Sequence, residues 1–230
     1  MAGIASLISY SCLLVTGLPS VVCNVTNLTS EVFIGIGSFF SSLKDIKHHG
    51  KETLIYFCLI FVGALIGSLI VSVESSTSFE KIVPFFVLIA AFLIVKPKSK
   101  IQHHFSDRTK RWLESGAFFA IFLMGIYCGY FGAASGVVFL ALLSVTSHSS
   151  FHVYNAIRNI SIMGGSIVSV IVFALRANVY WPLVLPLGIG MLIGGYLGPI
   201  IVRHVNEKVM KWIIAACALV LSVALFIKAY

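Results

Sequence analysis

Charged residues are scarce in this chain of 230 residues, and acidic residues are the scarcest of them. Only 10% of the residues are charged, with 8 Asp and Glu against 16 Lys and Arg, whereas a soluble domain usually carries about 25%. This shortage leaves too little polar sequence for a separate soluble domain. With 59% hydrophobic residues and a mean hydropathy of +1.02, the sequence predicts an integral membrane protein that is embedded over nearly its whole length.

Motifs of common enzyme and cofactor sites are also missing. The sequence has no G-x-x-x-x-G-K-[ST] nucleotide loop, no H-E-x-x-H zinc helix and no G-x-S-x-G nucleophile turn. Its five cysteines show no C-x-x-C spacing and lie in apolar segments. We therefore expect no enzyme, no cofactor and no bound metal. We also expect no nucleic-acid partner, because excess positive charge in a membrane protein usually marks loop orientation.

The chain contains nine hydrophobic segments, each rich in residues that form membrane helices. These segments are 2–18, 21–43, 53–73, 81–95, 115–131, 134–147, 151–175, 179–202 and 209–228. A full crossing needs about 20 apolar residues, so 2–18, 81–95 and 134–147 are short. We interpret 115–131 and 134–147 as two crossings, with a re-entrant pair as the alternative.

Basic residues concentrate in three loops. The 44–52 loop holds three lysines, the 96–111 loop holds six Lys and Arg, and the 203–211 loop holds three, whereas the 74–80 loop has two glutamates and no basic residue. By the positive-inside rule, the three basic loops lie in the cytoplasm and the acidic loop lies outside. The sequence therefore predicts a multi-pass protein of the inner cell membrane, with residues 96–114 as a cytoplasmic basic linker.

The two halves of the chain are similar to each other at a shift of 131 residues. At this shift IFVGALIGSLIV (60–71) aligns with MLIGGYLGPIIV (191–202), and VVCNVTN (21–27) aligns with HVYNAIR (152–158). Both pairs occur in the same order along the chain. We therefore predict an internal repeat.

The loop charges give the two halves opposite orientations, which is the pattern of inverted repeats in secondary transporters. The first transmembrane repeat covers residues 1–95, and the second covers 115–230. The first repeat lacks a counterpart of segment 115–131. The predicted fold is therefore all-α: a polytopic transmembrane helical bundle built from two inverted repeats, the first without its first helix.

Polar residues form a stripe on each of the two helices that the repeat pairs, 21–43 and 151–175. In the first helix they recur at steps of three or four, and in the second at spacings of three, four and seven, which places each set on one face. The first stripe is Asn24, Asn27, Glu31, Gly35, Ser38 and Ser42, and the second is Asn155, Arg158, Asn159, Ser166 and Ser169. We expect the two stripes to face each other or a cavity.

Glu31 and Arg158 are the two charged residues that lie clearly inside predicted spans, where a charge is costly. Arg158 presents five donors in a planar fork that matches an oxyanion. Three interpretations of Arg158 stay open: an anion ligand, a buried ion pair with Glu31, and a side chain that extends to the membrane surface. Glu31 is a candidate for coupling or for the ion pair.

Residues 129–143, GYFGAASGVVFLALL, precede a helix that bears asparagines, and this order resembles the sulfite exporter TauE/SafE family. The matching positions are Gly132, Ser135, Gly136, Leu143 and Asn155 to Asn159, and less closely Asn24, Thr26 and Asn27 in the first half. The triple glycine of the family is Ala134-Ser135-Gly136 here, and its proline is Ala141.

The resemblance implies a permease for small sulfur-containing anions such as sulfite, thiosulfate or sulfonates. Together with the missing nucleotide loop, it predicts a gradient-driven secondary transporter whose partners are the lipid bilayer and a small anionic substrate. The alternative is a non-transporting membrane scaffold or accessory subunit, and a homo-oligomer stays open. The candidate substrate-binding residues are Asn24, Thr26, Asn27, Ser135, Gly136, Asn155, Arg158 and Asn159.

Overall fold

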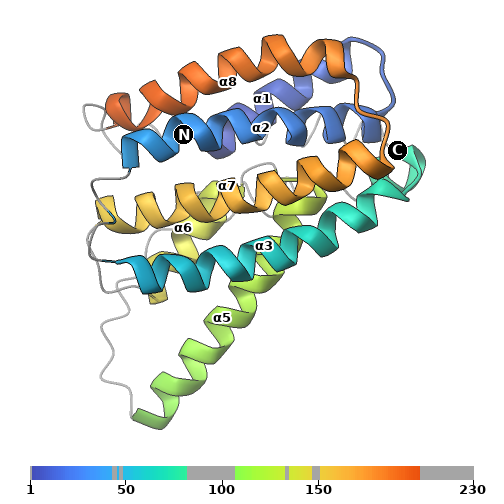
Figure 1. Ribbon diagram of the computed structural model, residues 1–230. Coiled ribbons are helices and arrows are strands. Elements are labelled where there is room, and N and C mark those ends of the chain that lie inside the picture. The colour runs from blue at the N-terminus through green and yellow to red at the C-terminus, as the bar shows by residue number, and fades with distance from the viewer. Residues whose placement is uncertain are drawn as a thin grey trace.

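The described part of the chain is almost entirely helical. The computed structural model describes residues 2–42, 46, 49–81, 107–132, 135–146 and 151–202. Its helices are α1 (Ala2–Val15), α2 (Ser20–Ser42), α3 (Gly50–Ser72), α5 (Asp107–Tyr130), α6 (Ser135–Thr146), α7 (Phe151–Arg176) and α8 (Trp181–Val202). Residues 76–81 are also helical, and no strand occurs within these ranges. The all-α prediction is confirmed (Figure 1).

Seven of the nine predicted segments correspond to these helices. Segment 209–228 lies outside the described residues, and so does 81–95 except for its first residue. The largest difference is at α5, which begins at Asp107 rather than at 115. Its first turns carry charged residues, which hydropathy assigns to a loop although Lys, Arg and Glu are good helix formers.

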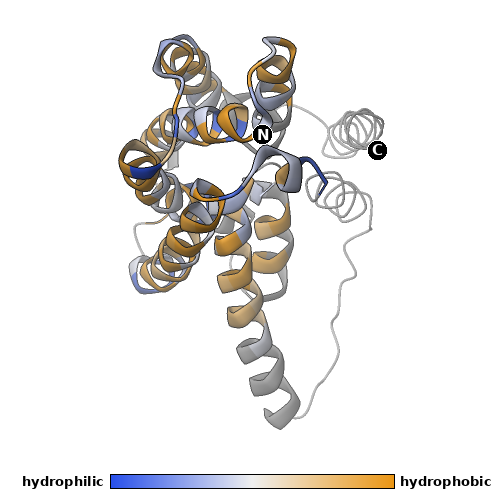
Figure 2. Cartoon of the chain, turned by 90° about the vertical axis from the view of Figure 1, so that its right-hand side faces the viewer, coloured by the Kyte–Doolittle hydropathy of each residue, from blue (hydrophilic) through white to orange (hydrophobic). Residues whose placement is uncertain are grey.

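The helices differ in whether they are long enough to cross a bilayer. Gly50–Ser72 and Asn155–Arg176 meet the length and hydropathy of a membrane span, and Gly116–Tyr130 and Trp181–Leu197 are shorter apolar stretches. Figure 2 shows hydrophobic residues along most of the helices. The 12 residues of α6 extend only about 18 Å, against about 30 Å of hydrocarbon core. This length favours the re-entrant alternative for α6, and α1, with 14 residues, is short in the same way.

The long helices pack in a pattern that relates the two halves. α2 packs along α8 and α7, and α3 packs along α7 and α5. In Figure 1, α3 and α7 run in one direction while α2 and α8 run in the other. The predicted repeat pairs α2 with α7 and α3 with α8. The α2–α8 contact therefore corresponds to the α7–α3 contact, and the helices of one contact run opposite to those of the other. An inverted repeat requires this arrangement, and the repeat itself stays a prediction.

Glycines allow the helix backbones to approach closely at two of these contacts. On α3, a Cβ at Gly67 would lie 2.0 Å from the carbonyl oxygen of Ile126 in α5. On α8, a Cβ at Gly195 would lie 2.7 Å from the carbonyl oxygen of Ile34 in α2. A Cβ at Gly194, by contrast, would meet nothing within 4 Å. Small residues thus fix the α3–α5 and α2–α8 spacings, as they do in other membrane bundles.

Buried hydrophobic side chains hold α6 in place. They form a cluster that joins α3, α5, α6 and α7. Its members are Tyr56, Ile60, Ile121, Met124, Phe139, Leu143 and Ile157. Because Phe139 and Leu143 are fully buried, the short helix is anchored by its apolar side, and its first residue takes a fixed position beside α2 and α7.

Candidate functional site

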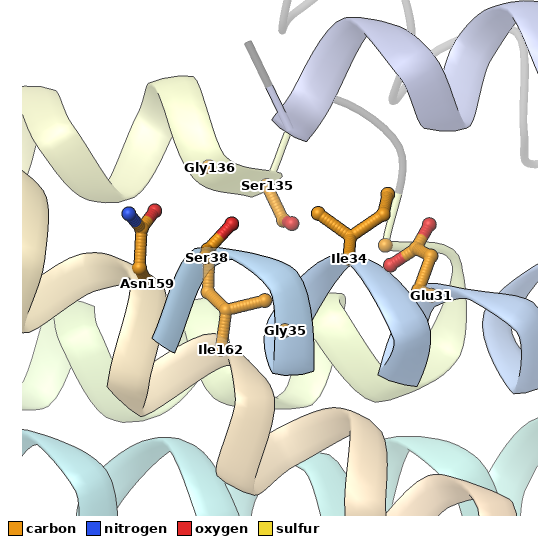
Figure 3. Close-up of a pocket in the computed structure, with 9 residues that line it drawn as sticks. Glu31, Ile34, Gly35, Ser38, Ser135, Gly136, Asn159 and Ile162 are labelled. Carbon is orange, nitrogen blue, oxygen red and sulfur yellow. The ribbon is translucent and has the colours of Figure 1, made fainter. Parts of the chain in front are cut away.

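A pocket lies where α2, α6 and α7 come together (Figure 3). Its empty volume, including the open mouth, is about 360 Å³. The lining residues are Glu31, Ile34, Gly35, Ser38, Gly132, Ser135, Gly136, Asn159 and Ile162. Within the described part of the chain, Glu31 is the single ionisable residue of this lining. The pocket therefore combines one carboxyl group with hydroxyl, amide and backbone groups.

The turn between α5 and α6 directs the first residues of α6 at this pocket. Gly132 adopts φ = 70°, a left-handed conformation that glycine enters without strain. Its N–H donates to the carbonyl oxygen of Tyr127 at 3.1 Å, which closes α5, and its own carbonyl accepts from the Ser135 N–H at 3.0 Å. The backbone N–H groups of a first helical turn have no partner within the helix, and the helix dipole is positive there. Ser135 and Gly136 thus bring a positive helix end to the pocket wall.

Glu31 is held at the opposite wall by neutral groups. It is buried, with 6% of its surface exposed. Its Oε1 accepts hydrogen bonds from the Ser6 hydroxyl of α1 and from the Asn27 Nδ2, the latter at 3.3 Å. Asn27 also donates to the Ser6 Oγ at 3.1 Å and accepts from the Ser9 hydroxyl. This network joins α1 to α2 and fixes the carboxyl group.

Arg158 lies behind the pocket and contacts it through Asn159. Its Nε and Nη2 donate to the Asn159 Oδ1 at 3.1 and 2.6 Å. Arg158 is 3% exposed, and no acidic residue of the described chain forms an ion pair with it. The structure therefore shows neither the ion pair with Glu31 nor the extension to the surface. Because arginine only donates, Oδ1 of Asn159 is the acceptor and its NH₂ group is the donor.

Three other predicted residues do not line the pocket. Asn24 donates from Nδ2 to the carbonyl oxygen of Tyr130 at 2.8 Å, at the end of α5. The Thr26 Oγ1 accepts from the Tyr180 N–H at 3.0 Å, just before α8. Asn155 is half-buried and lies one turn before Asn159 on the same face of α7. Asn24 and Thr26 thus attach α2 to neighbouring helix ends.

The pocket brings together about half of the predicted site. Ser135, Gly136, Asn159 and Glu31 line it, whereas Asn27 and Arg158 are bonded to lining residues. Residues that we did not predict are Ile34 and Ile162 in the lining, and Ser6 and Ser9 behind Glu31. The two isoleucines have no polar signal in the sequence. Ser6 and Ser9 are three residues apart, so they share a face of α1, and this spacing was the available signal.

A bundle of apolar helices around a buried polar pocket, with one short helix that begins at that pocket, fits the architecture of a membrane transporter. The chain belongs to the sulfite exporter TauE/SafE family, which matches residues 1–225. This confirms the resemblance that the Gly-rich element and the asparagine helix indicated.

Two curated relatives carry transporter names. One is a "Probable membrane transporter protein" of Haemophilus influenzae, 24% identical over 216 residues, which cover 92% of this chain and 82% of the relative. The other is a "Probable membrane transporter protein ORF9" of Sinorhizobium sp, 24% identical over 237 residues, or 98% and 85% of the two chains. No solved structure matches the chain. The protein is therefore a membrane transporter, and the scaffold alternative has no support from its relatives.

Proposed function

We propose that this transporter is a secondary permease for a small sulfur oxyanion or organosulfonate, such as sulfite or thiosulfate, in the inner cell membrane. The observation that carries the proposal is the pocket between α2, α6 and α7, where a helix N-terminus meets hydroxyl and amide groups. A site of this kind is suited to an anion because backbone N–H groups and the helix dipole favour negative charge.

The proposed ligands are the groups that reach this pocket. Ser135 and Gly136 offer a hydroxyl group and the first backbone N–H groups of α6, and Asn159 offers its amide. Arg158 acts through Asn159, because its two hydrogen bonds orient that amide and bring a positive charge close to the pocket. Asn155 lies one turn before Asn159 on the approach to the site. We propose that Asn24, Thr26 and Asn27, predicted as ligands, instead position α2.

The position of the pocket suits alternating access. α2 and α7 belong to different predicted repeats, and the pocket lies between them. Rocking of one repeat against the other would expose the bound anion to each side of the membrane in turn. Because no nucleotide-binding loop occurs in the sequence, an ion or substrate gradient is the proposed energy source.

Flux of labelled sulfite and thiosulfate into proteoliposomes tests the proposal. We expect flux in the wild type, and a reduction of about tenfold or more in Ser135→Ala and Asn159→Ala, because each removes a hydrogen bond to a charged ligand, worth about 1.5–3 kcal/mol.

Ser161→Ala is the matched control for these variants. Ser161 is on α7 and fully buried, its hydroxyl has no hydrogen-bond partner among the described residues, and it does not line the pocket. We expect wild-type flux from this variant. Equal flux in all four proteins would mean that the anion does not bind in this pocket.

A further inference from the structure

Glu31 lines the pocket, but the proposed anion site gives its carboxyl group no role. Glu31 lies at one end of the row of lining residues and Asn159 at the other (Figure 3). An ionised carboxylate in the same small, low-dielectric pocket would repel a bound anion. This pocket can therefore bind an anion well only if the carboxyl group of Glu31 is protonated, and so uncharged, while the anion is bound.

No cationic side chain of the described residues pairs with Glu31. Its hydrogen-bond donors are the Ser6 hydroxyl and the Asn27 amide, both uncharged and both directed at Oε1. Arg158, the buried charged residue of the facing α7, is bonded to Asn159 instead. A buried carboxylate without a counter-ion is costly, so the protonated acid is the favoured form once solvent leaves the pocket.

The other carboxyl oxygen is placed to take up that proton. Oε2 lies beside Gly132, 3.4 Å from the position that a Cβ on this glycine would occupy, and no hydrogen bond reaches it from the described residues. Gly132 itself lines the pocket, so Oε2 is on the pocket side of the carboxyl group. A side chain at position 132 would cover this oxygen.

The other titratable groups around Glu31 do not replace it. From α5, Tyr127 and Cys128 are within electrostatic range of the carboxyl group, and α7 contributes Arg158. From α1 the nearest contacts are serine hydroxyls. Neither α6 nor α8 contains an acidic or basic residue. Glu31 is thus the only carboxylic acid on α2, α6 and α7, the three described helices that line the pocket.

We infer that Glu31 is the proton-binding site of this transporter, and that it makes anion binding depend on a proton, so that anion and proton cross the membrane together. The inference rests on the proposed anion permease function. A hydronium ion from the solvent gives its proton to Oε2, a new O–H bond forms, water leaves, and the negative charge of Glu31 disappears. Anion binding then favours the protonated form, and protonation favours anion binding to the same extent.

The test uses the purified full chain in proteoliposomes and a labelled alkanesulfonate, which stays ionised over the whole working pH range, whereas sulfite itself takes up a proton near neutral pH. Two readings are needed: exchange of the anion without any gradient, and accumulation driven by an inward proton gradient, with a trapped pH dye to record proton entry. In the wild type we expect exchange that falls as pH rises, by up to about tenfold per pH unit for one proton, and an anion gradient that moves protons.

Glu31→Gln has nearly the shape of the protonated acid. We expect it to keep exchange, to lose the dependence of exchange on pH, and to lose proton-driven accumulation and dye response. Glu31→Asp should keep all of these with a changed pH profile. Glu52→Gln, which removes a carboxyl group bonded to His49 outside the pocket, should behave as the wild type.

Distinct outcomes would overturn the inference. The inference is wrong if Glu31→Gln still accumulates the anion in response to a proton gradient, or if a folded Glu31→Gln protein loses exchange. It is also wrong if accumulation in the wild type follows a sodium gradient. If Glu31→Gln does not fold, the wild type alone still tests the inference, because anion exchange without proton movement in the wild type would reject it. Absence of exchange in the wild type at every pH would remove the proposed function as well, whereas exchange without proton movement removes only this inference.

Discussion

At the scale of single residues, the two buried charges on α2 and α7 are satisfied separately. Glu31 receives two neutral donors, and Arg158 donates twice to one amide oxygen. A direct ion pair would have fixed both groups in the charged state. Neutral partners instead leave the carboxyl group able to change its protonation, while the arginine keeps its charge behind Asn159. Under the proposed function, this separation of the two groups is what would let the pocket bind both an anion and a proton.

Arg158→Ala should lower anion flux although Arg158 does not line the pocket. Its removal takes away the two hydrogen bonds that Arg158 donates to the Asn159 amide oxygen, together with the buried positive charge beside that amide, and we expect flux to fall by about tenfold or more. Arg158→Lys should recover only part of the flux, because an ammonium group cannot reproduce the two-pronged contact. Initial rates in proteoliposomes measure both effects. Arg176→Ala, at the exposed end of the same helix, is the control, and unchanged flux in Arg158→Ala would remove Arg158 from the site.

Asn24→Ala should affect stability more than transport. Asn24 is fully buried and donates to the carbonyl oxygen of Tyr130, so the variant leaves that carbonyl without this donor. We expect a loss of about 1–3 kcal/mol in the free energy of unfolding. Chemical unfolding in detergent measures it, with Ser161→Ala as a buried polar control. A folded Asn24→Ala protein of normal stability that transports poorly would restore Asn24 as a substrate ligand.

At the scale of helices, hydropathy and spacing predict most of the fold. Seven helices match predicted segments, and the polar stripe of α2 is buried from Asn24 to Ser38, as its spacing implied. Hydropathy misses the start of α5, because a helix needs good propensity rather than apolar residues. Spacing also identifies which face carries Arg158, but not the direction of its long side chain. The isoleucines of the pocket are not predictable, because apolar residues have the same pattern in a wall and in a core.

Gly67 on α3 and Gly194 on α8 form a matched pair for testing how closely the helices pack. A Cβ at Gly67 would collide with the α5 backbone, whereas one at Gly194 on α8, one turn before the repeat-related position Gly198, would meet nothing within 4 Å. We expect Gly67→Ala to cost about 1–3 kcal/mol through overpacking, and Gly194→Ala to change stability by about 0.5 kcal/mol or less. Thermal unfolding of both variants in one detergent measures the difference. If Gly67→Ala were as well tolerated as Gly194→Ala, the backbones of α3 and α5 would have to be farther apart than their contact at Gly67 implies.

At the scale of the whole molecule, the pocket depends on parts that are distant in the sequence. α2 comes from the first half of the chain, α6 and α7 come from the second, and the Ser6 hydroxyl that fixes Glu31 comes from near the start. The first predicted repeat contributes Glu31 and Ser38 to the pocket lining, and the second contributes Ser135, Gly136 and Asn159. Under the proposed function, a change in the relative position of the predicted repeats would alter both the access to the pocket and its geometry, and would thereby couple binding to the state of the whole bundle.

Anion binding should raise the thermal stability of the whole protein, because a ligand that binds only the folded state adds stability that grows with its concentration. The gain is about 2.7 kcal/mol at one hundred times Kd. We expect thiosulfate or an alkanesulfonate to raise the unfolding temperature of the detergent-solubilised protein, more at acidic than at alkaline pH. Ser161→Ala should respond as the wild type does, and Asn159→Ala should respond less. Chloride at equal ionic strength is the control for a general salt effect. Charge screening alone requires neither Asn159 nor a protonated Glu31. An equal rise of the unfolding temperature with chloride would therefore contradict a selective site.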